Sequence, residues 1–514
     1  MLVPKISFAA IALVTPLAAS AVTCDQVIQA LGTQISSPIC FHSSDLTTAN
    51  PLTTPADIGS LTTFADGVTP LPQGGFTPTT DRGVISPALK ANQTPITKAV
   101  PGVQLDAWIA GDPTGQARFL IRLPDDWNGK LVVAGASGTR SEFNGDIAWS
   151  DYVVQKGYAY ASQNKGVLNL KLVSLSSPTP PAADPTPCRL NPATGVWVHF
   201  YDNDPLKPFT QWTQYMIEGA QLARTAVKGA YNHFPARTYA VGTSNGGYQV
   251  RRAIEEAPDL FDGGVDWEGT FIDADGPNIL IDLPPAIENW PDYLASGFDP
   301  NSPAAKNLVA AGYPPDVVES ATLLGSLWGN YWNQFWEVTQ CQWQKRFDPD
   351  WQTYNGGLGD ITGTGGYDYL SRIAVDPSIA ARVAAVATTG KIKKPLITVA
   401  GTLDALLPIK RGARAYETRV DASRKGNNSQ REAQYRLYEI QNGNHIESYK
   451  DRTNAPAFPQ LEFIEPHAQK AFDLLVAHVE GNAPLPPSQC VARSGAIGAP
   501  SSTPGHCANL FVGP

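Results

Sequence analysis

The sequence predicts an α/β protein whose mostly parallel, doubly wound sheet is interrupted by one large insertion. Residues 209–267 alternate helical apolar patterns with short runs of strand-forming residues, in the order helix, strand, helix, strand. A glycine-rich turn at residues 242–247 joins the first of these strands to the second helix. The strand pattern stops over residues 271–385 and resumes at residues 394–401. This order is typical of crossover connections in a parallel sheet.

Further segments complete the predicted sheet. Residues 104–110 and 117–124 are expected to form paired antiparallel strands, followed by strands at 130–135, 157–162 and 434–440 and a closing helix at 466–480. The resulting divisions are a signal segment (1–21), an irregular N-terminal extension (22–100), a first core part (101–270), a lid insertion (271–385), a second core part (386–485) and a C-terminal tail tied by a disulfide (486–514).

The composition and the first residues indicate a secreted or periplasmic protein. Lys5 precedes an apolar run over residues 6–19, and Ala19-Ser20-Ala21 forms a small-x-small cleavage site. The apolar run is too short to span a bilayer comfortably and no second candidate follows it, so we expect no membrane span. The 38 basic and 47 acidic residues give a net charge of -9 with no basic block, which argues against a nucleic-acid partner.

Six cysteines in an exported chain favour disulfides over metal ligation or free thiols. Six cysteines allow fifteen pairings. Cys24 with Cys40 and Cys490 with Cys507 are close in sequence and lie in turn-rich termini. These two pairs would leave Cys188 with Cys341, a bridge between two long insertions. No cysteine has metal-ligand spacing with a histidine, and no metal site is expected among them.

The turn after the strand at residues 238–242 carries the candidate nucleophile. Gly242-Thr243-Ser244-Asn245-Gly246 fits the nucleophile elbow, in which small residues around a serine let the backbone fold tightly and expose its hydroxyl. The alternative interpretation is a glycine-rich turn with an idle serine. The helix, strand, turn, helix, strand context favours the elbow, with Ser244 as nucleophile.

An aspartate and a histidine follow two later strands. Asp404 comes just after the strand at 394–401, and His445 comes just after the strand at 434–440. A serine hydroxyl is a poor nucleophile at neutral pH, so a histidine must accept its proton and an acid must orient that histidine. We therefore predict a triad of Ser244, Asp404 and His445. Asp266, which also follows a strand, is the main rival of Asp404.

Backbone N–H groups near the serine are expected to form an oxyanion hole. The residue after the nucleophile supplies one N–H in such sites, and a loop after a neighbouring strand supplies another. Asn245 is the first candidate, and Ala136 and Ser137 are the others because they follow the strand at 130–135.

The lid insertion is rich in aromatic residues and poor in charge. Trp328, Trp332 and Trp336 repeat at helical spacing. Such a stripe forms packed core more often than a ligand wall, and one helical face must pack into the body. We nevertheless expect some of these three tryptophans to contact substrate.

From residue 130 to the closing helix the chain resembles α/β-hydrolase-fold serine esterases, most closely the tannase and feruloyl esterase group. The resemblance is carried by the elbow with its following glycine, Phe261-Asp262-Gly263, the lid, Gly401-Thr402-Leu403-Asp404, Gly443-Asn444-His445 and the segment at 474–484. It implies hydrolysis of carboxylic esters, often of aromatic acids, by the three triad residues. Thr243 and Asn444 stand where tannase-type enzymes carry cysteines joined by a disulfide.

Three other functions stay open. The Ser244-Asn245-Gly246-Gly247 sequence is also similar to elbows in hydrolases of 3-hydroxyalkanoate oligomers and related polyester fragments. An amidase or peptidase could use the same triad, and a non-catalytic binding protein would be expected to lack one member of it.

The expected partner is a small-molecule or oligomeric ester. No nucleotide, flavin or pyridoxal phosphate motif is apparent, so no cofactor is expected, while Asp273 and Asp275 could form either a calcium loop or, more simply, a turn.

Overall fold

A computed structural model describes residues 21–53, 94–138, 140–167, 171–174, 188–191, 196–199, 209–351, 366–424 and 435–498. The predicted signal segment lies outside the described residues except for Ala21, and Cys507 of the third predicted disulfide also lies outside them.

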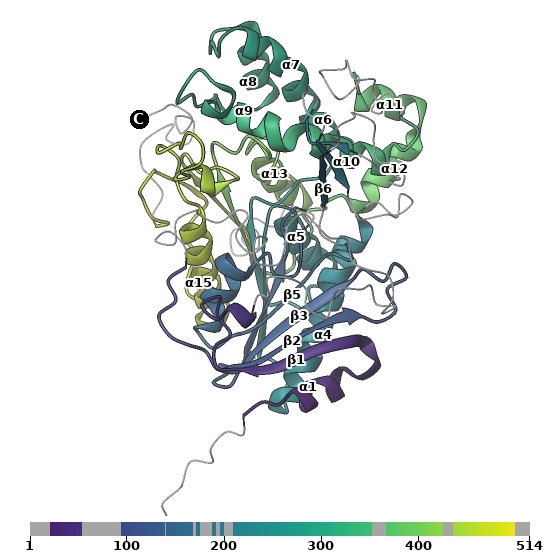
Figure 1. The fold of residues 1–514 in the computed structure, drawn as a ribbon, viewed down its shortest axis with the longest axis vertical. Coiled ribbons are helices and arrows are strands. Elements are labelled where there is room, and N and C mark those ends of the chain that lie inside the picture. Colours follow the sequence, from purple (N-terminus) through teal and green to yellow (C-terminus); the bar gives the residue numbers. More distant parts are fainter. Residues whose placement is uncertain are drawn as a thin grey trace, which may run out of the picture.

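The described residues form a mixed ten-stranded sheet in the order β1-β2-β3-β5-β4-β9-β10-β11-β12-β13 (Figure 1). Neighbours are antiparallel from β1 to β5, and all pairs from β5 to β13 are parallel. The strands are β1 (Ile35–Ser43), β2 (Gly102–Ile109), β3 (Arg118–Pro124), β4 (Lys130–Gly135), β5 (Ala159–Gln163), β9 (Arg237–Thr243), β10 (Gly263–Trp267), β11 (Leu396–Gly401), β12 (Tyr435–Ile440) and β13 (Gln489–Val491). This crossover order, with a sharp turn after β9, is that of the α/β-hydrolase fold and confirms the predicted fold class.

Both faces of the sheet are buried, because its strands alternate apolar side chains toward two separate cores. In β4, Val132 packs on the face that α15 (Glu465–Gly481) covers, whereas Val133 packs on the face covered by α4 (Thr210–Tyr231), α5 (Asn245–Glu256) and α13 (Ala413–Ser423). Helices α4 and α15 thus flank the sheet on opposite sides.

The N-terminal segment is more regular than expected. It contains α1 (Cys24–Leu31), which packs on α4, and β1, which pairs with β2 at the edge of the sheet. The expectation of an irregular extension over 22–100 is therefore wrong for these residues. The reason is that the middle of an edge strand faces solvent and needs few hydrophobic residues, and in β1 Ser37 and Pro38 are exposed at a register shift.

Helices between β10 and β11 gather at one end of the sheet (Figure 1). They are α6 (Ile279–Asp282), α7 (Pro284–Ala295), α8 (Pro303–Ala311), α9 (Leu327–Tyr331), the π-helical turn η6 (Trp332–Trp336), α10 (Glu337–Phe347), α11 (Tyr369–Val375) and α12 (Pro377–Val386). We call residues 271–385 the helical insertion. No helix among the described residues is both long and apolar enough to cross a membrane.

Two disulfides lie within the described residues. Cys24 is bonded to Cys40, and Cys188 is bonded to Cys341. The second bridge connects the small sheet of β6 (Lys171–Ser174), β8 (Val196–His199) and β7 (Cys188–Arg189) to α10 of the helical insertion. Two insertions that are distant in sequence are thereby fixed against each other. Short helices complete the described elements: η1 (Gly32–Gln34), η2 (Pro51–Thr53), η4 (Asp146–Ser150), α3 (Asp151–Val154), η5 (Leu323–Gly325) and η8 (Glu447–Tyr449).

Candidate active site

Ser244 occupies a strained turn between β9 and α5. Its φ of 58° and ψ of -122° lie in a region that non-glycine residues rarely adopt. Its backbone N–H donates to Trp267 O at 2.8 Å, and its carbonyl accepts from Tyr248 N at 3.0 Å, so hydrogen bonds on both sides hold the turn. This is the geometry of a nucleophile elbow.

Glycines on both sides of the serine allow this turn. A Cβ on Gly242 would lie 2.3 Å from Gly246 O, and a Cβ on Gly246 would lie 2.3 Å from Gly135 O. Any side chain at either position would therefore push α5 away from β9 or from the end of β4. The small residues identified in the motif are required by backbone contacts.

The structure brings the three predicted triad residues together. His445 Nε2 lies 2.9 Å from Ser244 Oγ, and His445 Nδ1 lies 2.8 Å from Asp404 Oδ2. Asp404 Oδ1 accepts from the backbone N–H groups of Leu406 and Leu407 at 2.8 and 2.7 Å, which fixes the carboxylate. All three triad side chains are buried.

The loop that carries Asp404 and the loop that carries His445 approach each other closely. A Cβ on Gly401 would lie 2.3 Å from the carbonyl carbon and oxygen of Gly443, and Leu403 N donates to Gly443 O at 2.8 Å. The loop that carries Asp404 therefore rests directly on the loop that carries His445. Asn444, which stands in place of a tannase-type cysteine, instead accepts a hydrogen bond from Tyr331 of the helical insertion at 2.7 Å.

Asp266, the rival acid, lies elsewhere. Its Oδ2 accepts from Arg251 Nε at 2.6 Å and from Thr398 Oγ1 at 2.8 Å, and its Oδ1 accepts from Gly269 N at 2.7 Å. Arg251 and Asp266 are both fully buried, so this pair belongs to the protein interior. Asp404, rather than Asp266, contacts His445.

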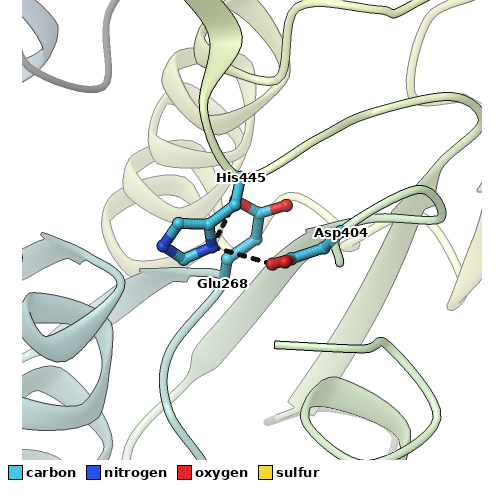
Figure 2. Close-up of side chains that lie close together, drawn as sticks. All are labelled: Glu268, Asp404 and His445. Atoms are coloured by element: carbon cyan, nitrogen blue, oxygen red, sulfur yellow. Dashed lines mark hydrogen bonds and ion pairs between the residues drawn. The ribbon is translucent and has the colours of Figure 1, made fainter. Parts of the chain in front are cut away.

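A second carboxylate, which the sequence analysis missed, faces His445. Figure 2 shows Glu268 and Asp404 directed at the same imidazole, and Glu268 Oε2 lies 3.5 Å from Nδ1. Burial opposes protonation of His445, but the carboxylates of Asp404 and Glu268 outweigh it and raise the pKa of the imidazole. Burial and then the charge of Asp404 raise the pKa of Glu268 well above that of an ordinary glutamate. The sequence signal was available, because Glu268 directly follows β10.

The same cluster has the donor types of a divalent-cation site. One ligand atom from each of Glu268, Asp404 and His445 lies within 4.8 Å of the others. However, Nδ1 contacts Asp404 and Nε2 contacts Ser244, so both ring nitrogens already have hydrogen-bond partners. A hydrogen-bonded relay accounts for this arrangement.

In the predicted turn or calcium loop, Asp273 pairs with Arg419 and its Oδ1 accepts from Asp275 N at 3.2 Å.

The predicted oxyanion-hole residues differ in the state of their N–H groups. Asn245 is the first residue of α5, and among the described residues its N–H has no partner. Ser137 N donates to Asn144 Oδ1 at 2.8 Å, so this N–H is engaged within its own loop. We therefore correct the expectation for Ser137, whose N–H is unavailable in this conformation. Ala136 and Asn245 stay as candidates.

A cavity of about 520 Å³ opens beside Ser244 and His445. Phe335 of η6, Trp343 of α10 and Tyr449 form part of its wall, and Arg140 is the one lysine or arginine among its described lining residues. Phe335 belongs to the aromatic stripe at helical spacing, whereas no sequence pattern singled out Trp343 or Tyr449.

None of the three predicted tryptophans is among the described residues that line this cavity. Trp328 donates from Nε1 to Pro314 O at 3.1 Å, and Trp336 donates to Ala405 O at 2.7 Å. Trp332 stacks on Trp290 with ring centroids 5.7 Å apart. All three are buried in the core, so substrate contact by these tryptophans is not supported. The expectation was wrong because helical spacing shows that a face is buried without showing what buries it.

Part of the chain is similar in sequence to one hydrolase family. The sequence model of 3HB-oligomer hydrolase (3HBOH) matches residues 361–509, which include Asp404 and His445. A D-(-)-3-hydroxybutyrate oligomer hydrolase of Burkholderia thailandensis is 33% identical over 129 residues, covering 24% of this chain and 17% of that protein. Its Burkholderia mallei counterpart is 33% identical over 113 residues, covering 22% and 15%. The chain thus spans less than a fifth of the length of these curated relatives.

Solved structures of esterases are similar in fold. Feruloyl esterase B from Aspergillus oryzae has a TM-score of 0.45 and 14% identity, over 78% of this chain and 86% of that chain. Tannin acyl hydrolase from Aspergillus niger has a TM-score of 0.42 and 13% identity, over 79% and 87%.

Proposed function

We propose that this chain is a serine hydrolase that cleaves carboxylic esters through a covalent acyl-enzyme. The observation that carries this proposal is the continuous hydrogen-bond path from Ser244 Oγ through both ring nitrogens of His445 to Asp404. A buried aspartate at Nδ1 keeps the proton on that nitrogen and leaves Nε2 free to accept one. The raised pKa of His445 makes it a stronger base.

In the proposed reaction, Ser244 Oγ attacks the ester carbonyl while His445 Nε2 accepts the hydroxyl proton. The N–H groups of Asn245 and Ala136 stabilise the negative charge that develops on the carbonyl oxygen. His445 then gives the proton to the departing alcohol as the carbon–oxygen bond breaks. Water attacks the acyl-enzyme with His445 again as base, releasing the carboxylic acid and restoring Ser244.

Replacement of Ser244 tests this mechanism. Ser244→Ala is expected to lose about 10⁴ to 10⁶ in kcat, because no other group supplies the attacking oxygen. A serine-directed phosphonate should label the wild type at Ser244 and leave the variant unlabelled. Ser448→Ala is the matched control, since Ser448 lines the same cavity without contacting His445 in the described relay. A folded Ser244→Ala protein with roughly a tenth of wild-type activity would exclude the assignment.

We propose two candidate substrate classes. Esters of aromatic acids are favoured by the rings of Phe335, Trp343 and Tyr449, against which an aromatic acyl group can pack in offset or edge-to-face contact. Because Phe335 and Trp343 belong to the helical insertion, we propose that this insertion acts as a lid over the acyl pocket. Either the acyl or the alcohol side of the scissile ester could pack against these rings. Rates for matched ester and amide substrates would distinguish an esterase from an amidase.

Oligomers of 3-hydroxyalkanoates are the second class. They are supported by the family match over the residues that carry Asp404 and His445, and by the charge of the cavity. Arg140 lines the cavity and already has a partner within the protein, and we propose that its guanidinium, which carries five N–H donors, also contacts the free carboxylate of such a substrate. Polyester fragments end in such a carboxylate, whereas simple aromatic esters do not.

A pair of substrates distinguishes the two classes. If oligomers are the substrate, a 3-hydroxybutyrate trimer should be cleaved with a higher kcat/KM than its terminal methyl ester, and Arg140→Gln should remove that preference. Arg140→Lys, which keeps the charge, should preserve part of it. Faster cleavage of aryl or cinnamoyl esters than of the trimer would favour the aromatic class instead.

We also propose that the protein is exported with residues 1–21 removed. The disulfides Cys24–Cys40 and Cys188–Cys341 support an oxidising compartment. Sequencing the mature N-terminus should return Val22, whereas a mature protein that begins at Met1 would contradict export by this signal.

A further inference from the structure

Glu268 is fixed at both ends, immediately beyond β10. Its backbone has a φ of 51°, and its N–H donates to Val399 O of β11 at 2.9 Å. Its side-chain Oε1 accepts from Gly401 N at 2.9 Å, at the start of the loop that carries Asp404. The carboxylate is therefore held between two neighbouring strand ends.

The other carboxylate oxygen points at His445. Oε2 lies 3.5 Å from Nδ1 and has no hydrogen-bond partner within the described part of the chain (Figure 2). The Glu268 side chain is 1% exposed and that of His445 is 2% exposed, so water does not screen this contact. An oxygen buried without a hydrogen bond is costly unless it meets a charge.

We propose that Glu268 is a positioning residue that acts as a second carboxylate for His445, supplementing Asp404 and substituting for it when the Asp404 charge is removed. Asp404 Oδ2, at 2.8 Å, holds the Nδ1 proton in the resting site. Glu268 approaches the same nitrogen from the end of the adjacent strand. It stabilises the imidazolium that forms when Ser244 is deprotonated. This inference rests on the proposed hydrolase function.

The charged and titratable groups around Glu268 determine when it can act. Burial, and then the charges of Asp404 and Glu447, raise the pKa of Glu268, whereas the imidazolium of His445 lowers it. The Tyr331 hydroxyl of the helical insertion also faces this group of carboxylates. Removing the charge of Asp404 would therefore favour ionisation of Glu268, so the substitution becomes more effective in an Asp404→Asn protein.

Four proteins test the proposal: wild type, Glu268→Gln, Asp404→Asn and the double variant. Glutamine keeps the size of Glu268 and its acceptor for Gly401. Protonation of His445 favours ionisation of Glu268, so Glu268→Gln removes a negative charge beside the imidazolium. The acidic limb of kcat/KM is therefore expected to shift toward lower pH, on the order of 1 unit. Asp404→Asn is expected to lose about 10² in kcat, because Glu268 still faces His445. The double variant is expected to lose about 10⁴, which is the loss typical when the acid is removed from a triad that has only one.

A merely structural role for Glu268 would lower Tm without moving the pH profile. Glu447→Gln is the matched control, because Glu447 is a buried glutamate that hydrogen-bonds to the backbone of Ile464 and Glu465 rather than to His445. It should shift the acidic limb less than Glu268→Gln does. Where Glu268→Gln does not fold, Glu268→Asp withdraws the carboxylate by one methylene and should reproduce the pH shift in smaller degree.

An unchanged acidic limb in Glu268→Gln, together with a double variant no slower than Asp404→Asn, would overturn the proposal. Failure of the proposed function looks different: Ser244→Ala would remain active and wild-type Ser244 would resist phosphonate labelling. Loss of labelling in Ser244→Ala, with normal behaviour of every Glu268 variant, would reject only the role of Glu268.

Discussion

Substituting asparagine at Asp266 or at Asp404 should have opposite consequences, although both aspartates lie just after or at the end of a parallel strand. In Asp266→Asn, the buried guanidinium of Arg251 loses the carboxylate 2.6 Å away. Asparagine can accept one hydrogen bond but carries no charge, so Arg251 is left uncompensated in the interior. Breaking such a buried pair typically costs about 3 to 5 kcal/mol.

That cost can be converted to a melting temperature. An unfolding entropy of about 2.1 cal/mol/K per residue gives roughly 1 kcal/mol/K for a chain of this length, so the expected decrease in Tm is about 3 to 5 °C. Asp404→Asn keeps an oxygen for the N–H groups of Leu406 and Leu407, so its Tm should change little. Its kcat should fall instead, because the imidazole loses its main carboxylate partner.

The assay combines differential scanning fluorimetry with kcat for a chromogenic ester, measured well below the Tm of each variant so that the protein is folded. The reasoning predicts low Tm with retained kcat for Asp266→Asn, and retained Tm with low kcat for Asp404→Asn. The reverse pattern would show that Asp266, and not Asp404, orients His445.

Three further predictions concern other parts of the molecule. Trp336→Leu should lower the free energy of unfolding by roughly 2 to 4 kcal/mol because Trp336 is fully buried. Phe335→Leu, at the cavity wall, should keep Tm and raise KM for aromatic esters. Thermal melts and kinetics on both variants check these two outcomes. Burial raises the pKa of Asp151 to about 7, so the native state binds more protons than the unfolded state between pH 4 and 7 and stability falls as pH rises through that window. Asp151→Asn should accordingly raise Tm at pH 8 and leave it nearly unchanged at pH 4. Replacing Cys188 and Cys341 by serine should raise KM more than it lowers kcat, since the bridge holds two walls of the cavity together, and non-reducing peptide mapping of the wild type should recover the linked pair.

The sheet and the positions of Ser244, Asp404 and His445 could be predicted because both follow from short-range signals. Parallel strands show as buried apolar runs, and their carboxyl ends meet along one edge, so polar residues that follow such runs converge. The same rule applied to β10 would have found Glu268. The sequence does not distinguish Glu268 from Asp266, two residues earlier, because it does not show that Arg251 and Thr398 bind Asp266.

Long-range packing was harder to predict. The tryptophans of the helical insertion repeat at helical spacing, but the sequence does not show which neighbouring segments cover each face of the helix. Only the structure distinguishes Phe335 and Trp343 at the cavity from Trp336 in the core. The engaged N–H of Ser137 was equally hidden, because its partner Asn144 lies seven residues away in a loop without a regular pattern.

Glycines, more than the acids, set the geometry around His445. Gly401 has no room for a side chain against Gly443, so the loops bearing Asp404 and His445 touch through their backbones. The N–H of the same Gly401 binds Oε1 of Glu268, which directs Oε2 toward Nδ1. One residue therefore fixes the distance of His445 from both carboxylates. Because the two acids come from adjacent strand ends, their relative position depends on the sheet register, which pairs Trp267 with Val399. The sheet register therefore holds the two carboxylates in place. This matters because small displacements of catalytic groups lower the reaction rate strongly.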